Sequence, residues 1–75
     1  MKTIAVDSTT LHTVGYDAGR QLLQIELHDH SLYQYFDVPT VLYEELMKAP
    51  SKGAYFNRSI RPRLDYVLVK AASLS

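Results

Sequence analysis

The sequence predicts an α+β domain, in which an antiparallel sheet of three or four strands packs against two short helices. Three observations predict this fold, with the element order β-β-β-α-α-β. Residues 21–27 alternate between apolar and polar side chains, which is typical of a strand with one buried face. After Val38-Pro39, apolar residues recur at helical spacing instead. The length of 75 residues fits one domain over residues 1–75.

The first two strands form a predicted hairpin. Residues 11–16 carry the β-branched and aromatic side chains that favour strands. Residues 17–20 then resemble a hairpin loop, in which Gly19 is free to take a positive φ. The second strand follows at residues 21–27, with Leu23, Ile25 and Leu27 on one face.

A third strand extends the hairpin into a meander. Residues 28–31 form a polar turn, and residues 32–37 form the strand. Three strands joined by tight turns are expected to bury one face and expose the other. A last strand is predicted at residues 64–70, beside the meander. Residues 71–75 are expected to be a flexible tail.

Two helices are predicted between the meander and the last strand. Pro39 suits the first helical position, where its missing N–H costs nothing, and Pro50 ends this helix. Ser51 can cap a shorter helix over residues 54–59, which Arg61-Pro62 ends. The residues expected to form one core are Leu23, Ile25, Leu27, Leu42, Leu46, Phe56 and Ile60.

Composition excludes several classes of protein. The apolar fraction is 47% and the charged fraction 21%, as in ordinary globular domains. There is no cysteine, which excludes disulfides, zinc–thiolate sites and a thiol nucleophile. The first seven residues lack the apolar core of a signal peptide, and no run approaches the ~18 apolar residues of a membrane span. We therefore expect a cytoplasmic protein without membrane contact.

The net charge of zero hides an asymmetry along the chain. Residues 1–47 hold two cations against seven carboxylates, whereas residues 48–75 hold six cations against one carboxylate. The two halves can neutralise each other when folded together. Alternatively, the basic half forms an electrostatic footprint for an anionic partner.

Two tyrosines are candidates for base stacking. Tyr33 and Tyr35 are two positions apart on a strand, so their rings project from one face. Exposed rings on a sheet form a platform for unpaired bases. The alternative is that both rings fill the core, or cover the sheet beneath the helices.

Four polar residues around the second helix are candidates for binding a nucleic-acid backbone: Lys52, Asn57, Arg58 and Arg61. Each has a structural alternative. Asn57 can satisfy backbone groups in a turn, and Arg61 can pair with Asp37 or a helix-end carbonyl.

Metal binding and catalysis find little support. His12, His28 and His30 could suggest a metal site, but histidines in a polar turn need no reason beyond solvation. Glu44 and Glu45 are adjacent on a helix and point to different sides, so they make no acid/base pair. No phosphate-cradling glycine loop is present. We expect no catalytic residue, no metal and no cofactor.

Two dense segments carry a resemblance to a known family. The first is Tyr33-Gln34-Tyr35-Phe36-Asp37-Val38-Pro39, and the second runs from Ser51-Lys52-Gly53 through Phe56-Asn57 to Ile60-Arg61. Their order resembles the KTSC domain, a module found alone or at the C-terminus of some lysyl-tRNA synthetases. The resemblance covers residues 6–69. It implies a non-catalytic binding module for RNA, either tRNA or single-stranded RNA. The alternative is a module that binds a protein partner or a second copy of itself.

Overall fold

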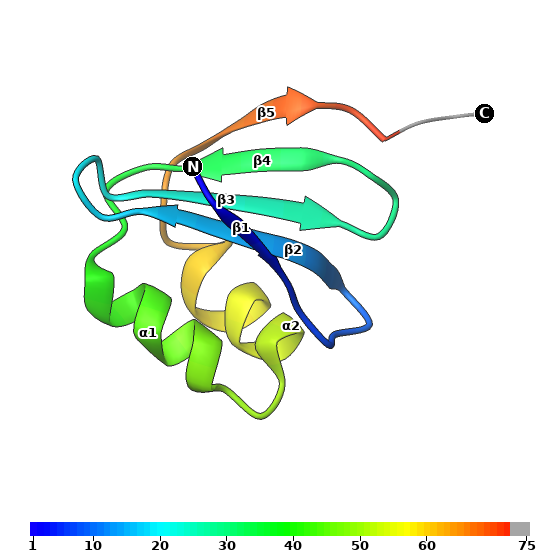
Figure 1. The fold of residues 1–75 in the computed structure, drawn as a ribbon, viewed down its shortest axis with the longest axis horizontal. Coiled ribbons are helices and arrows are strands. Elements are labelled where there is room, and N and C mark those ends of the chain that lie inside the picture. Colours follow the sequence, from blue (N-terminus) through cyan, green and yellow to red (C-terminus); the bar gives the residue numbers. More distant parts are fainter. Residues whose placement is uncertain (73–75) are drawn as a thin grey trace.

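The computed structural model describes residues 1–72 as a five-stranded antiparallel sheet with helices against one face (Figure 1). The strands lie in the sheet in the same order as in the chain. The α+β class is confirmed, and the sheet has more strands than the three or four predicted. The elements are β1 (Thr3–Ala5), β2 (Leu11–Asp17), β3 (Leu22–Leu27), β4 (Leu32–Tyr35), α1 (Thr40–Lys48), α2 (Lys52–Tyr55), η1 (Phe56–Ile60) and β5 (Tyr66–Lys70).

The predicted meander is present as β2, β3 and β4. Ile25 at the centre of β3 faces Val14 in β2 and Tyr33 in β4, so the three side chains share the face that the helices cover. The hairpin turn between β2 and β3 differs in detail from the prediction. Gln21 takes the positive φ, at 52°, and Gly19 does not. The composition of the loop did not indicate which residue would adopt the positive φ.

Both edges of the sheet differ from the prediction. The edge strand β1 was missed, because three exposed residues give no pattern of alternating burial. At the other edge, β5 pairs with β4 and begins at Tyr66 rather than at residue 64. The tail expected at 71–75 lies largely outside the described residues, which end at 72.

The helical region begins as predicted and then departs from regular α-helix. Pro39 lies one position before α1 rather than within it. Ser51 caps α2, because its hydroxyl accepts a hydrogen bond from the Ala54 N–H at 3.3 Å. The chain then widens into the π-helical turn η1, where the Arg61 N–H donates to the Phe56 carbonyl at 2.9 Å. The helix predicted at 54–59 is present, but residues 56–59 are π-helical rather than α-helical.

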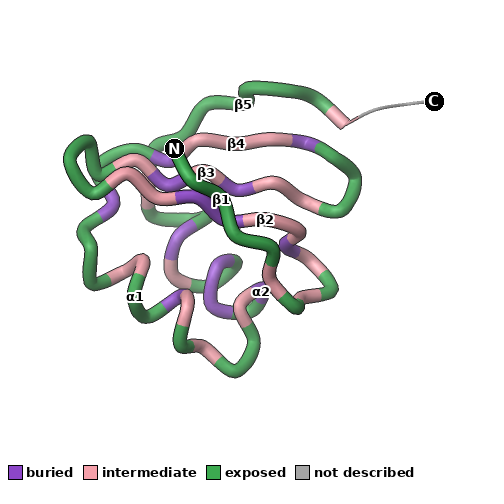
Figure 2. The backbone as a smooth tube through the Cα atoms, viewed as in Figure 1, coloured by how far each residue is buried: buried purple, intermediate pink, exposed green. Residues whose placement is uncertain are grey.

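One core lies between the sheet and the helices (Figure 2). Five of the seven predicted core residues are fully buried, and Leu27 and Leu42 pack against them while partly exposed. The predicted core is therefore confirmed. The buried apolar side chains are Leu11, Val14, Leu23, Ile25, Tyr35, Val38, Leu46, Tyr55, Phe56 and Ile60.

Gly53 allows α2 to approach the segment before β2. A Cβ atom at this position would lie 2.9 Å from the Thr10 Oγ1 and 3.3 Å from the Ser8 Oγ. The glycine is therefore needed for close packing, and its backbone is buried rather than open to a ligand. No helix within residues 1–72 has the length and apolar character needed to cross a membrane.

Candidate binding site

A small recess lies where β3, β4 and β5 meet the end of η1. Its volume is about 40 Å³. That volume admits a water molecule or two, whereas pockets that enclose a small ligand are several-fold larger. A nucleobase would therefore have to lie across the mouth of the recess. The residues that line the recess are Leu27, Tyr33, Tyr35, Phe56, Arg61 and Tyr66.

The two predicted stacking residues face the helices. Tyr35 is only 2% exposed, and its ring meets that of Phe56 edge-on at a centroid distance of 5.5 Å. Burial raises the pKa of Tyr35, and the nearby Arg61 guanidinium opposes that rise. Tyr35 therefore offers no free ring face to a base, because the helical layer covers it. Tyr33 is partly buried and lines the recess.

The ring that reaches solvent belongs to Tyr66, which the sequence reading did not select. Tyr66 faces Tyr35 across β4 and β5, yet it is 52% exposed. Its ring lies 5.6 Å from Tyr33 and 5.3 Å from Tyr35. A signal did exist, because Tyr66 is the first aromatic residue after Arg61-Pro62-Arg63. The sequence did not indicate which strand of the meander the last strand would pair with, and that strand is β4.

Arg61 is the predicted cation that the fold brings to the recess. Its Nη1 donates a long hydrogen bond of 3.4 Å to the Asn57 Oδ1, one turn earlier. Both side chains are exposed. Arg61 makes no ion pair with Asp37 within the described residues. Asn57 therefore orients the Arg61 guanidinium at the rim, and most N–H donors of the guanidinium stay available.

The other two predicted cations lie outside the lining of the recess. Arg58 is exposed, and its guanidinium carbon lies 5.9 Å from the centre of the Tyr55 ring. Lys52 donates from its Nζ to the Ala49 carbonyl at 3.3 Å, across the junction of the two helices. The start of α2 is also closed to a phosphate, because Ser51 takes the Ala54 N–H and Gly53 is buried.

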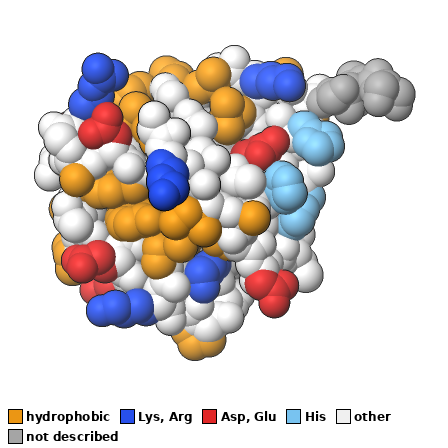
Figure 3. All heavy atoms as spheres, viewed as in Figure 1, with side chains coloured by type: hydrophobic (Ala, Val, Ile, Leu, Met, Phe, Trp, Pro, Cys, Tyr) orange, Lys and Arg blue, Asp and Glu red, His pale blue; other side chains and the backbone are white. Residues whose placement is uncertain are grey.

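Ion pairing leaves the basic half of the chain unneutralised. The ion pairs within residues 1–72 are Arg20–Asp17 at 3.8 Å and His30–Glu26 at 3.7 Å, both in the acidic half. The cations from residue 48 onward therefore have no carboxylate in contact within that range. Figure 3 shows lysine and arginine side chains dispersed over the face in view, among exposed hydrophobic side chains.

The three histidines gather at one side of the molecule (Figure 3). The ring of His12 lies 5.3 Å from that of His28 and 6.4 Å from that of His30. The His28 Nε2 is already hydrogen-bonded to the Ser8 carbonyl at 2.6 Å. In the described part of the chain, no three histidine, cysteine or acidic side chains are arranged to hold a metal ion.

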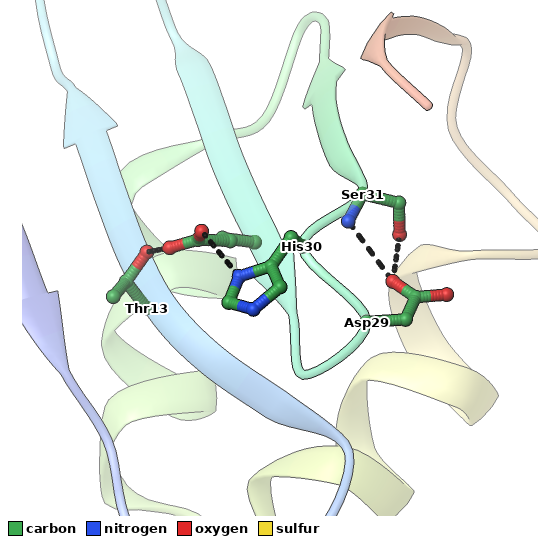
Figure 4. Close-up of polar contacts among 5 residues, drawn as sticks. Thr13, Asp29, His30 and Ser31 are labelled. Carbon is green, nitrogen blue, oxygen red and sulfur yellow. Dashed lines mark hydrogen bonds and ion pairs between the residues drawn. The ribbon is translucent and has the colours of Figure 1, made fainter. Parts of the chain in front are cut away.

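The neighbouring polar contacts hold the turn between β3 and β4 (Figure 4). Asp29 Oδ1 accepts the Ser31 N–H at 2.9 Å and the Ser31 hydroxyl at 2.5 Å, and these bonds lower the pKa of Asp29. Glu26 accepts from the Thr13 hydroxyl at 3.0 Å on the neighbouring strand. These contacts give the polar residues of the turn a structural role, so no bound ligand is needed to explain them.

Comparison with known proteins identifies the family. The family model described as the KTSC domain matches residues 7–66. The chain belongs to the KTSC domain family. A KTSC domain protein from Yersinia pestis has a crystal structure that superposes with a TM-score of 0.88 at 28% identity, covering 92% of this chain and 97% of that one.

Related sequences occur both as small proteins and within larger ones. An uncharacterised protein of Stutzerimonas stutzeri is 36% identical over 63 residues, covering 84% of this KTSC chain and 89% of that protein. A lysine–tRNA ligase of Trichormus variabilis is 43% identical over 51 residues, which is 68% of this chain but 9% of the ligase. The KTSC chain is thus similar to a small segment of the ligase.

Proposed function

We propose that this KTSC domain is a non-catalytic module that binds RNA at the mouth of the recess. The observation that carries the proposal is the pairing of an exposed aromatic ring, Tyr66, with an exposed guanidinium, Arg61, on one rim. Among the described residues this guanidinium has no carboxylate partner. A ring beside an available cation suits a ligand that is both flat and anionic.

Each group has a distinct part in this proposal. A base lies over the exposed part of Tyr66, a stacking contact worth roughly 1–3 kcal/mol. Arg61 donates to a phosphate through its planar fork, and Arg58 supplies a second charge from the same helical turn. Tyr33 and Asn57 position the ring and the guanidinium respectively. Tyr35 supports the site from the core.

The relatives supply the biological setting of the proposal. The similarity to a segment of lysine–tRNA ligases supports tRNA or another RNA as the ligand, and the cytoplasm as the place of action. The hydroxyl–carboxylate hydrogen bonds Ser31–Asp29, Thr13–Glu26 and Tyr55–Glu45 all lie outside the lining of the recess, which supports binding without catalysis at this site. Because the net charge is zero, we expect affinity no tighter than roughly 10⁻⁶ M at physiological salt.

Fluorescence anisotropy with labelled single-stranded RNA and with tRNA tests the proposal at low and moderate salt. Arg61→Ala should weaken binding to all sequences and flatten the salt dependence by about one unit. Tyr66→Ala should weaken binding about tenfold, which corresponds to the loss of one stacked base. Lys2→Ala and Val41→Ala are matched controls, which remove a charge and an exposed apolar side chain elsewhere.

Two results would contradict the proposal. The first is no binding of either RNA at low salt, where phosphate contacts are strongest. The second is a loss of affinity in Lys2→Ala as large as in Arg61→Ala, which would indicate attraction without a site. Arg61→Lys separates charge from geometry, because lysine keeps the charge but lacks the fork.

A further inference from the structure

The outer edge of β5 is open to solvent. All five of its residues are exposed, and β5 lies at the rim of the sheet away from α1 and α2 (Figures 1 and 2). Within residues 1–72 no strand pairs with its outer side. Proteins usually protect such edges with short strands, charges, prolines or bulges. In β5 the charge of Lys70 and an irregularity in the pairing with β4 lie at the C-terminal end, beyond Leu68, so the central residues are unprotected. The opposite edge follows that rule, because β1 has three residues and Lys2 precedes it.

The backbone of β5 presents hydrogen-bonding groups along this edge. The Phe36 N–H donates to the Asp65 carbonyl at 3.0 Å, so the backbone of Asp65 points toward the chain that continues β4. Backbone direction alternates along an antiparallel strand. Val67 therefore also points toward β4, while Tyr66 and Leu68 direct their N–H and C=O groups outward.

The side chains of β5 are complementary to those of a second copy of the strand that runs in the opposite direction. The central residues are Tyr66, Val67, Leu68 and Val69, which are 52%, 45%, 51% and 49% exposed. A carboxylate precedes them at Asp65 and an ammonium follows them at Lys70. Antiparallel pairing of two such strands places the carboxylate end of one strand beside the ammonium end of the other, whereas parallel pairing places like charges side by side.

We infer that β5 is a self-pairing edge, which joins two copies of the chain into one continuous antiparallel sheet. The ladder is centred on Val67, which faces Val67 of the second copy. Tyr66 then exchanges backbone hydrogen bonds with Leu68 of the second copy, and the reverse pair does the same. Asp65 comes within one position of Lys70 of the second copy.

The second copy also completes the recess. Tyr66 and Leu68 share the helix-facing side of the sheet, because they face Tyr35 and Tyr33 across β4. In the paired sheet, Leu68 of the second copy lies beside Tyr66 and adds an apolar wall to its open side. The two-fold axis is perpendicular to the sheet, so both recesses open on the same side of the assembly.

Sedimentation of the purified chain without RNA tests the inference independently of the proposed function. We expect the mass to rise from monomer to dimer with concentration, because five residues a side make a small, reversible interface. Val67→Lys should raise the dissociation constant at least about tenfold, because it sets two like charges directly opposite each other. Ile4→Lys on the β1 edge is the matched control and should leave the dimer unchanged.

A charge exchange tests the register separately from apolar contact. Lys70→Asp should weaken the dimer, because each end of the ladder then holds two carboxylates. Adding Asp65→Lys in the same chain should restore it. Circular dichroism confirms folding, and both positions are exposed at the strand ends.

A chain that stays monomeric at every concentration overturns the inference, and leaves the edge to an extended segment of another protein. A dimer that survives Val67→Lys but is lost in Ile4→Lys overturns it as well. Failure of the double exchange to restore a dimer that Lys70→Asp weakens overturns the proposed register.

Discussion

Tyr35 and Tyr66 face each other across neighbouring strands, but they differ strongly in solvent exposure. Tyr35 is 2% exposed and packs on Phe56, whereas Tyr66 is 52% exposed at the rim of the sheet. Their ring centres are only 5.3 Å apart. The helical layer therefore ends between β4 and β5. On one side of that boundary a tyrosine stabilises the fold, and on the other it is available to a ligand.

The largest expected effect is the loss of stability when the buried tyrosine of this pair is replaced by alanine. Tyr35→Ala should lower the free energy of unfolding by about 3–5 kcal/mol, because it removes a buried ring and leaves a cavity. Tyr66→Ala should cost about 1 kcal/mol, since only its contacts with neighbouring rings are lost. Urea denaturation measures both variants. Equal losses would show that β5 belongs to the core as fully as β4 does.

The same contrast can be made within one helix. Leu46→Ala should cost about 2–5 kcal/mol, because Leu46 is fully buried beneath the sheet. Val41→Ala on the exposed side of α1 should change stability by at most about 0.5 kcal/mol. Thermal melts of the two variants give the comparison. A silent Leu46→Ala would mean that α1 faces the sheet with a different side.

The covered part of the molecule was predicted from sequence far better than the rim. Alternation in residues 21–27 and helical spacing after Val38-Pro39 both report burial, so they identified β3, α1 and most of the core. All three residues of β1 are exposed, so they give no alternating pattern and the strand was missed. Periodicity also placed Tyr33 and Tyr35 on one face, but it could not locate the end of the helical layer. For the same reason Tyr66 was overlooked.

A smaller effect concerns the cap that starts the helix beneath Tyr35. Ser51→Ala removes the acceptor for the Ala54 N–H and should cost about 1 kcal/mol. Ser51→Asp should retain most of the stability, because aspartate is also a good capping residue. Chemical denaturation of the three chains is the measurement. Equal loss in both variants would show that the hydroxyl makes another essential contact.

The smallest effect is a pH dependence in the alkaline range. Burial raises the pKa of Tyr35, so folding favours its neutral form. This contribution is complete below the unfolded tyrosine pKa of about 10, and is lost as the pH rises through the raised value. Tyr35→Phe should therefore lose less stability than the parent chain above pH ~10. Parallel pH curves in denaturation experiments would contradict this expectation.

The direction in which the Arg61 side chain points depends on the number of residues in the π-helical turn η1. The hydrogen bond of a π-turn spans five residues and that of an α-turn spans four, and each residue of an α-helix rotates the chain by about 100°. Deleting one residue between Phe56 and Ile60 would let the segment wind as ordinary α-helix, with better hydrogen bonds. The guanidinium would then swing away from the aromatic rim. A shortened chain of this kind would have a more regular helix, but it would lose the position of the guanidinium on which the proposed RNA contact depends.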